Sequence, residues 1–175
     1  KPYIIYKKLQ EIKEGEYLLY MDAGCTFNNS GFPRFREYIS MLESSDTPLL
    51  SYQMNHLPEK YYTNDKVFDY FEISDNSEIK NTGQIMATIQ FIKNCEYTKK
   101  VIKKWLDILY QDSNLFTDYY KCNREDFRDN RHDQSIFSVI RKLYGSVYLE
   151  DETYFLNFRG SESLKYPLWA TRKNF

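Results

Sequence analysis

The stretch Tyr17-Leu18-Leu19-Tyr20-Met21-Asp22-Ala23-Gly24-Cys25 decides the fold class of this chain. Its first five residues form a short apolar run without charge, which predicts a strand buried on both faces. The run ends abruptly at Asp22. Because ligands of α/β sheets gather in the crevice outside the carboxyl ends of the strands, we expect the Asp22 carboxylate to point into such a crevice. Ala23 and Gly24 keep the neighbouring surface small, which lets a bulky ligand approach the backbone.

Helical and extended patterns alternate on both sides of this strand. Apolar residues recur at helical spacing after Pro2, with Gly15 as a stop signal, and again from Pro33. Further helices are predicted at 64–71, 97–110 and 133–143, and further strands at 48–54, 84–92 and 146–149. Residues 56–63 are expected to form a loop, and residues 111–131 carry no clear pattern. The alternation predicts one α/β layered domain over residues 1–175.

Composition excludes several classes of protein. The chain has 175 residues, and its 24 Lys and Arg against 25 Asp and Glu leave a net charge of −1, so it offers no field for capturing nucleic acid. No apolar run approaches the roughly 20 residues of a membrane helix. The three cysteines form no CxxC pair, which argues against a disulfide framework or a zinc cluster. We therefore expect a cytoplasmic domain in a reducing compartment.

Asp22 is the first candidate for chemistry. A carboxylate at the end of a buried strand suits a hard divalent cation, Mg²⁺ or Mn²⁺, that is shared with substrate phosphates. The alternative is that Asp22 ends the strand by capping a turn. The two interpretations are equally compatible with the local sequence.

The second candidate is the segment Arg131-His132-Asp133-Gln134-Ser135 at the start of a predicted helix. Asp133 lies where the helix dipole and free backbone N–H groups favour an anion. His132 and Gln134 add hydrogen-bonding groups suited to ligands that are rich in hydroxyls. The alternative is a plain N-terminal cap, which local sequence favours, although the clustering of polar residues points toward a site.

Other polar residues are weaker candidates. His56 and Glu59 share a segment after the second strand, and they lie at the same edge of the sheet as Asp22 if the strands are parallel; otherwise they belong to a solvated turn. Gln84 precedes a strand and is expected at the opposite edge unless that strand is antiparallel. Cys25 could act as a nucleophile, but neither histidine has a spacing that pairs with it. The chain has no GxGxxG, Walker, GxSxG or HExxH motif.

Four segments together resemble a known family. Leu19–Cys25 is similar to the strand that carries the DxD metal motif of GT-A-fold nucleotide-sugar glycosyltransferases. Lys1–Ile5, Thr82–Gln84 and Arg131–Ser135 resemble segments of polysaccharide-type glycosyltransferases from viruses and bacteria. The similarity spans nearly the whole chain in the expected order. It implies a GT-A-like, Rossmann-like mixed sheet flanked by helices.

The resemblance also implies a reaction and roles for residues. The reaction is transfer of a sugar from a nucleotide-diphosphate-sugar donor to the hydroxyl of a glycan or another acceptor. Asp22 matches the metal ligand, with Mn²⁺ or Mg²⁺ as cofactor, and Asp133 matches a residue near the sugar and acceptor that acts as general base or positions the acceptor. The residues expected to bind donor or acceptor are Gly24, His56, Gln84, Arg131, His132 and Gln134.

Two departures from the family pattern bear on these expectations. Gly24 stands where the motif has its second carboxylate, so metal binding would depend on Asp22, donor phosphates and water. Only one helix precedes Tyr17, whereas the family begins with a βα unit of roughly 30 residues that binds the base. We expect that this first βα unit lies outside the present numbering and that the catalytic domain is partial at its N-terminus.

Two other functions remain open at this point. The first is a catalytically degenerate homologue that binds a sugar or nucleotide without turnover, which Gly24 and the short N-terminal part favour. The second is a metal-dependent phosphoesterase built around Asp22, His132 and Asp133. Two-metal sites need several ligands, and the chain has only two histidines and few clustered carboxylates.

Overall fold

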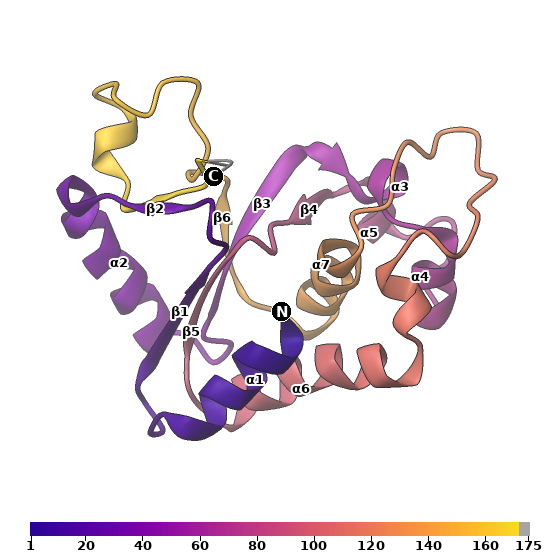
Figure 1. The fold of residues 1–175 in the computed structure, drawn as a ribbon, viewed down its shortest axis with the longest axis horizontal. Coiled ribbons are helices and arrows are strands. Elements are labelled where there is room, and N and C mark those ends of the chain that lie inside the picture. Colours follow the sequence, from indigo (N-terminus) through magenta and orange to yellow (C-terminus); the bar gives the residue numbers. More distant parts are fainter. Residues whose placement is uncertain (172–175) are drawn as a thin grey trace.

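A five-stranded sheet forms the centre of the computed structural model, which describes residues 1–171 (Figure 1). Four strands follow the order β1-β5-β3-β4, and β6 pairs with β3 as well. The pairs β1–β5, β3–β5 and β3–β4 are antiparallel, whereas β6 runs parallel to β3. The strands are β1 (Tyr17–Met21), β3 (Leu49–Pro58), β4 (Gly83–Ile85), β5 (Ile89–Lys93) and β6 (Val147–Glu150).

Helices and a small second ribbon surround this sheet. The helices are α1 (Pro2–Glu11), α2 (Phe32–Glu43), α3 (Glu59–Tyr62), α4 (Asp65–Tyr70), α5 (Glu78–Asn81), α6 (Glu96–Gln111) and α7 (Asp133–Tyr144). Short 3₁₀ turns are η1 (Asn29–Gly31), η2 (Ser113–Phe116) and η3 (Ser163–Lys165). The two-residue strands β2 (Thr26–Phe27) and β7 (Leu168–Trp169) pair antiparallel and hold the chain after β6 against the region that follows β1.

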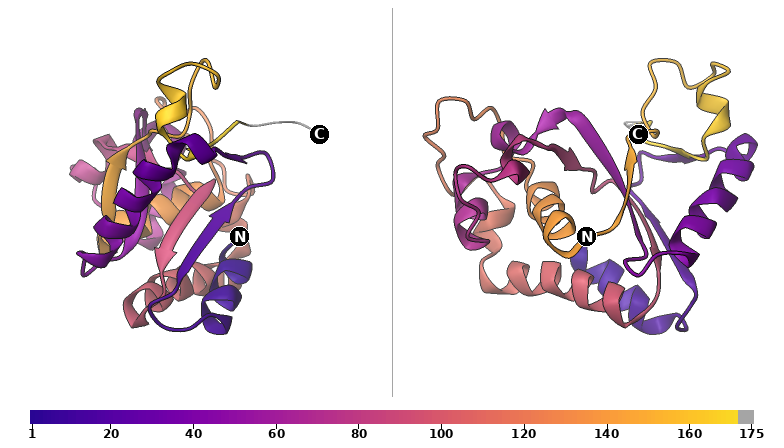
Figure 2. Two further views of the ribbon diagram at one scale, coloured as in Figure 1. Left: turned by 90° about the vertical axis from the view of Figure 1, so that its left-hand side faces the viewer. Right: turned by 180° about the vertical axis from the view of Figure 1, so that it is seen from behind.

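Two buried clusters lie on opposite faces of the sheet. Leu49 of β3 belongs to the cluster with Trp105 of α6 and Phe137 of α7, whereas its neighbour Leu50 belongs to the cluster with Leu42 of α2. Successive residues of a strand point to opposite faces, so α2 covers one face and the helices α1, α6 and α7 cover the other. Figure 2 shows this layering from two further sides. The prediction of an α/β domain with a mixed sheet and flanking helices is confirmed.

Several local predictions are also confirmed. β1 has the predicted bounds, and α2, α6 and α7 lie where helical spacing placed them. Asn64 caps α4 by accepting a hydrogen bond from the Lys66 N–H at 2.9 Å. Gly145 ends α7 with a φ of 87°, a left-handed value that favours glycine.

Three predictions about the sheet are wrong. β1 is not buried on both faces: its residues are all partly exposed, because it pairs along one side only, with β5. The predicted loop at 56–63 is instead the end of β3 followed by α3. The predicted single strand at 84–92 is two strands, β4 and β5, which pair with successive parts of β3.

Gly83 sits at an irregularity between β3 and β4. The register of this pair shifts between Met54 and Pro58. A Cβ atom on Gly83 would lie 2.3 Å from the backbone oxygen of Met54, so only glycine permits this approach. β4 is antiparallel to β3, which is the case in which Gln84 was not expected at the opposite edge of the sheet.

Two further findings concern the expected absence of a membrane helix and the expected state of the cysteines. Within residues 1–171, no helix is both long enough and apolar enough to cross a membrane. The cysteines Cys25, Cys95 and Cys122 are all free thiols.

Candidate functional site

Five of the predicted site residues line one cavity of about 420 Å³. They are Asp22 and Gly24 from the turn after β1 and Arg131, Asp133 and Gln134 from the start of α7. The rest of the wall consists of Lys1, Cys25, Met54, Leu57, Met86 and Thr88. The fold thus brings together two segments that are far apart in the sequence.

The backbone around Asp22 is tightly held. Its N–H donates to the Thr88 oxygen at 3.0 Å, and its carbonyl accepts from the Cys25 N–H at 2.9 Å, which closes the turn. The Tyr20 hydroxyl donates to Asp22 Oδ1 at 2.8 Å. Burial, together with this carboxylate, raises the pKa of Tyr20 well above its usual value, so Tyr20 remains a donor. The carboxylate therefore keeps Oδ2 for the cavity.

Lys1 joins the two predicted carboxylates. Its Nζ lies 3.2 Å from Asp22 Oδ2 and 3.0 Å from Asp133 Oδ2. Burial by itself lowers the pKa of this ammonium, but Asp133 and Asp22 outweigh that effect and raise the pKa above its usual value. A cation at this point therefore interacts with both carboxylates at once.

Asp133 is the first residue of α7. The residue before it, His132, has a φ of 52°, a conformation that redirects the chain sharply into the helix. The Gln134 N–H donates to the Arg131 oxygen at 3.0 Å, which fixes this turn. Because the N-terminus of a helix carries partial positive charge, the dipole of α7 stabilises an ionised carboxylate here.

Arg131 supplies a second cation to the cavity wall. Its guanidinium lies 5.0 Å from the centre of the Tyr62 ring, and its Nε lies 3.8 Å from Asp129 Oδ2. The side chain is 40% exposed, so it is accessible to a ligand. Together, Lys1 and Arg131 provide charge of the sign that a phosphate group requires.

Gln134 is hydrogen-bonded to a buried polar network that lies outside the cavity. Its Nε2 donates to Gln84 Oε1 at 2.8 Å, and its Oε1 accepts from the Ala87 N–H at 3.3 Å. Gln84 is fully buried, and its own Nε2 donates to Thr63 Oγ1 at 2.9 Å. Gln84 thus lies outside the cavity and positions Gln134, and its predicted contact with a sugar stays a prediction.

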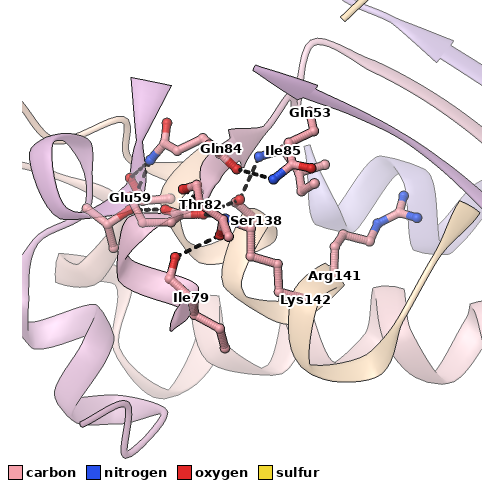
Figure 3. Close-up of polar contacts among 12 residues, drawn as sticks. Gln53, Glu59, Ile79, Thr82, Gln84, Ile85, Ser138, Arg141 and Lys142 are labelled. Atoms are coloured by element: carbon pink, nitrogen blue, oxygen red, sulfur yellow. Dashed lines mark hydrogen bonds and ion pairs between the residues drawn. The ribbon is translucent and has the colours of Figure 1, made fainter. Parts of the chain in front are cut away.

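The network continues to a buried ion pair. Figure 3 shows Ser138 of α7 between Glu59 and the backbone of Ile85: its hydroxyl donates to the Glu59 carboxylate and accepts from the Ile85 N–H. Lys142 Nζ lies 2.7 Å from Glu59 Oε1, and both side chains are almost completely buried. Burial lowers the pKa of Lys142, which Glu59 only partly offsets. These contacts fix α7 to α3 and β4, and so fix the helix start that carries Asp133.

The two histidines lie outside this cavity. His56 lines adjoining cavities rather than the one around Asp22. His132 Nε2 lies 2.9 Å from Oδ1 of Asp118, a residue of the long segment that precedes α7. Their predicted roles in binding stay predictions.

Cys25 is a poor candidate for a nucleophile. Burial raises the pKa of its thiol, and the nearby Asp22 carboxylate raises it further. Since the thiolate is the reactive form, this environment keeps Cys25 unreactive.

Asp22 and Asp133 could supply two carboxylate ligands to one divalent cation. Both Oδ2 atoms approach a single cationic point, and Mg²⁺ is commonly bound by one or two carboxylates together with substrate phosphates. In the described part of the chain, no group of three or more His, Cys, Asp or Glu is placed to hold a metal by itself. A metal at this point would therefore complete its shell with phosphate and water, and it would displace the Lys1 ammonium.

Sequence reasoning missed Lys1, Met86 and Thr88. Lys1 belongs to a segment that carried part of the family resemblance, but nothing in its spacing indicates a contact with Asp22 or Asp133. Met86 and Thr88 enter the cavity because the segment between β4 and β5 passes the end of β1. Strand pairing of this kind has no local signal.

Comparisons with protein families, with curated proteins and with solved structures find no match for this chain.

Proposed function

We propose that the chain is a glycosyltransferase that moves a sugar from a nucleotide-diphosphate-sugar donor to an acceptor hydroxyl. The observation that carries this proposal is the meeting of Asp22 and Asp133 at one cavity, around Lys1. The two carboxylates come from two of the four segments that resemble glycosyltransferases, and they are neighbours in space although remote in sequence.

The cavity has groups that suit each part of such a donor. Lys1 and Arg131 offer cations for the diphosphate, and the Gln134 amide offers hydrogen bonds for sugar hydroxyls. Asp22 would hold a divalent ion together with the phosphates, which leaves Asp133 for the acceptor hydroxyl. When bound, that ion would neutralise charge on the leaving diphosphate as a Lewis acid.

In this proposal, Asp133 acts on the acceptor. In the reaction, the acceptor oxygen attacks the anomeric carbon, the bond from that carbon to the phosphate oxygen breaks, and the nucleoside diphosphate leaves with the electron pair. The hydroxyl proton passes to Asp133, or Asp133 orients the hydroxyl while another base takes the proton. General-base catalysis of this kind raises the reaction rate about 10²- to 10⁴-fold.

A binding protein without turnover is the second candidate. The observation in its favour is the Lys1 ammonium, which pairs with both carboxylates and occupies the point that a metal would take. A two-metal phosphoesterase is disfavoured, because residues 1–171 contain no cluster of three metal-ligating side chains.

A donor-cleavage assay tests the proposal. The chain is incubated with Mn²⁺, a pool of oligosaccharides and UDP-, GDP- or dTDP-sugars, and release of the nucleoside diphosphate is measured. A CMP-sugar, which carries a monophosphate, is the control donor. Release that depends on the oligosaccharides supports transfer. Binding of a donor without release supports the second candidate, and release without dependence on oligosaccharides indicates hydrolysis.

A further inference from the structure

Two further cavities lie beside the cavity around Asp22 and Asp133. One of about 180 Å³ shares Met54, Met86 and Thr88 with it. The next, of about 310 Å³, shares Met54, His56, Asp151 and Tyr154 with the second. The three cavities therefore adjoin one another, and we call the second and third together the acceptor groove. It ends at Glu150 of β6 and Asn55 of β3.

We propose that the acceptor groove binds an uncharged oligosaccharide chain whose terminal hydroxyl reaches Asp133. This inference rests on the proposed function, since it names the acceptor of that same site. It adds Tyr154 and Asp151, which no motif in the sequence indicates, as residues that bind the acceptor.

Tyr154 gives the groove an aromatic wall. Its side chain is 51% exposed, and its ring meets that of Phe158 nearly at a right angle, with 5.9 Å between centroids. Phe158 in turn packs against Phe155 at 5.8 Å and Trp169 at 5.6 Å. An aromatic ring held in this way offers an apolar face, with a polar tip, to the C–H groups of a sugar ring. Tyr154 is therefore packed against a cluster of three further aromatic rings.

Polar groups line the rest of the acceptor groove. Asp151 Oδ1 accepts hydrogen bonds from the Thr153 N–H at 2.9 Å and the Thr153 hydroxyl at 2.7 Å, so its carboxylate is held in place. His56 and Asn55 add groups that exchange hydrogen bonds with hydroxyls. A wall with one aromatic ring and several fixed polar groups is the chemistry that a neutral sugar chain requires.

The cavity around Asp133 and the acceptor groove differ in the charge of the side chains that line them. The former has the cations Lys1 and Arg131, which suit a diphosphate. The described walls of the acceptor groove contain the carboxylates of Glu150 and Asp151 and neither lysine nor arginine. An acidic glycan would be repelled there, so we infer an uncharged chain.

Calorimetric titration with defined hexasaccharides tests the inference. The probes are the neutral maltohexaose, cellohexaose and chitohexaose and the acidic hexagalacturonate. The proteins are the unchanged chain, Tyr154→Ala, Tyr154→Phe and the control Tyr119→Ala, which removes a 68% exposed ring that packs on Tyr120. Circular dichroism and melting temperature establish that each variant folds.

We expect at least one neutral hexasaccharide to bind. Tyr154→Ala should weaken that binding at least tenfold, whereas Tyr154→Phe and Tyr119→Ala should bind as the unchanged chain does, and hexagalacturonate should not bind. The inference is overturned if no neutral probe binds, if Tyr154→Ala binds normally, or if the acidic probe binds equally well.

Donor binding, measured separately in the same proteins, distinguishes this inference from the proposed function. If a nucleotide sugar binds but no hexasaccharide depends on Tyr154, the acceptor groove is wrong and the proposed function stands. If a hexasaccharide binds through Tyr154 and no nucleotide sugar binds at all, the proposed function is wrong while the groove as a glycan site is supported.

Discussion

Asp22 and Asp133 direct their Oδ2 atoms at the same ammonium nitrogen, that of Lys1, at 3.2 and 3.0 Å. One carboxylate follows an edge strand and the other begins a helix. Alone, each is an ordinary turn or cap residue. Together they form a paired acidic site inside a cavity that also has two cations, and this pairing is the physical basis of the proposed function.

Replacement of Lys1 should strengthen metal binding. Its ammonium lies between the two carboxylates, and a divalent ion has to displace it. We expect Lys1→Ala to raise the affinity for Mn²⁺ about tenfold, equal to about 1.4 kcal/mol. Titration calorimetry measures this directly. The matched control is Lys8→Ala, which removes an exposed lysine of α1, the helix that follows Lys1; Lys8 pairs with Glu11. Weaker Mn²⁺ binding in Lys1→Ala would contradict the assignment.

Replacement of Asp133 should separate binding from transfer. Asp133→Asn keeps the size of the side chain but removes the group that accepts a proton. We expect the transfer rate to fall about 10²- to 10⁴-fold while the dissociation constant of the donor changes less than about tenfold. Single-turnover assays with donor-binding titrations measure both quantities. Asp107→Asn, on the exposed side of α6, is the control. Full activity in Asp133→Asn would place the base elsewhere.

Arg141 should destabilise the fold through its buried charge. It is fully buried on Phe137, its Nη2 donates to Gln90 Oε1 at 2.7 Å, and its Nε and Nη1 have no hydrogen-bond partner among residues 1–171. We expect Arg141→Met to raise the free energy of unfolding by about 1–3 kcal/mol, because an apolar chain of similar length needs no hydration. Denaturant unfolding measures the change.

The effect of Arg141 should depend on pH. Burial lowers its pKa to about 9, so the folded chain loses this proton at a lower pH than the unfolded chain does. The loss of unfolding free energy caused by the buried charge is therefore greatest below about pH 9, and it becomes smaller as the pH rises above that value. The stability difference between Arg141→Met and the unchanged chain should therefore narrow from pH 8 to pH 10. A constant difference would show that the guanidinium is not responsible.

Removal of one charge of the buried Glu59–Lys142 pair should lower the free energy of unfolding. Glu59→Gln leaves the Lys142 ammonium, which is 8% exposed, without its carboxylate. We expect a loss of about 3 kcal/mol of unfolding free energy, most of which returns in the double variant Glu59→Gln, Lys142→Met. Chemical denaturation of the unchanged chain, of each single variant (Glu59→Gln and Lys142→Met) and of the double variant measures this. Glu11→Gln, in an exposed pair, should leave stability unchanged. Additive losses in the double variant would refute the coupling.

Local patterns in the sequence predicted most helices and the position of β1. Apolar spacing along α6 and α7 reflects one buried face per helix, and the Asn64 cap and Gly145 terminator act through neighbouring backbone groups. The predicted strand at 84–92 failed because Met86, Ala87 and Thr88 contain no turn residue, although the chain changes partner there. That change depends on pairing with β3, which is remote in sequence.

The candidate site was predictable in its carboxylates and unpredictable in its surroundings. Asp22 and Asp133 each carry a local signal, at a strand end and at a helix start. The contact of Lys1 with both, and the position of Gln84 behind Gln134, follow from tertiary packing. His56 lies in the acceptor groove rather than beside Asp22 because β3 extends through Pro58, so the expected loop is part of the sheet.

A thermal-shift screen tests the central claim most directly. The unchanged chain and Asp22→Asn are melted with UDP-, GDP-, dTDP- and CMP-sugars, with and without Mn²⁺. A ligand at a hundredfold excess over its dissociation constant adds about 2.7 kcal/mol of stability, which raises the melting temperature. We predict that one diphosphate donor stabilises the unchanged chain only with Mn²⁺ and does not stabilise Asp22→Asn. No stabilisation by any donor, or equal stabilisation of Asp22→Asn, would contradict the claim that Asp22 and Asp133 form a nucleotide-sugar site.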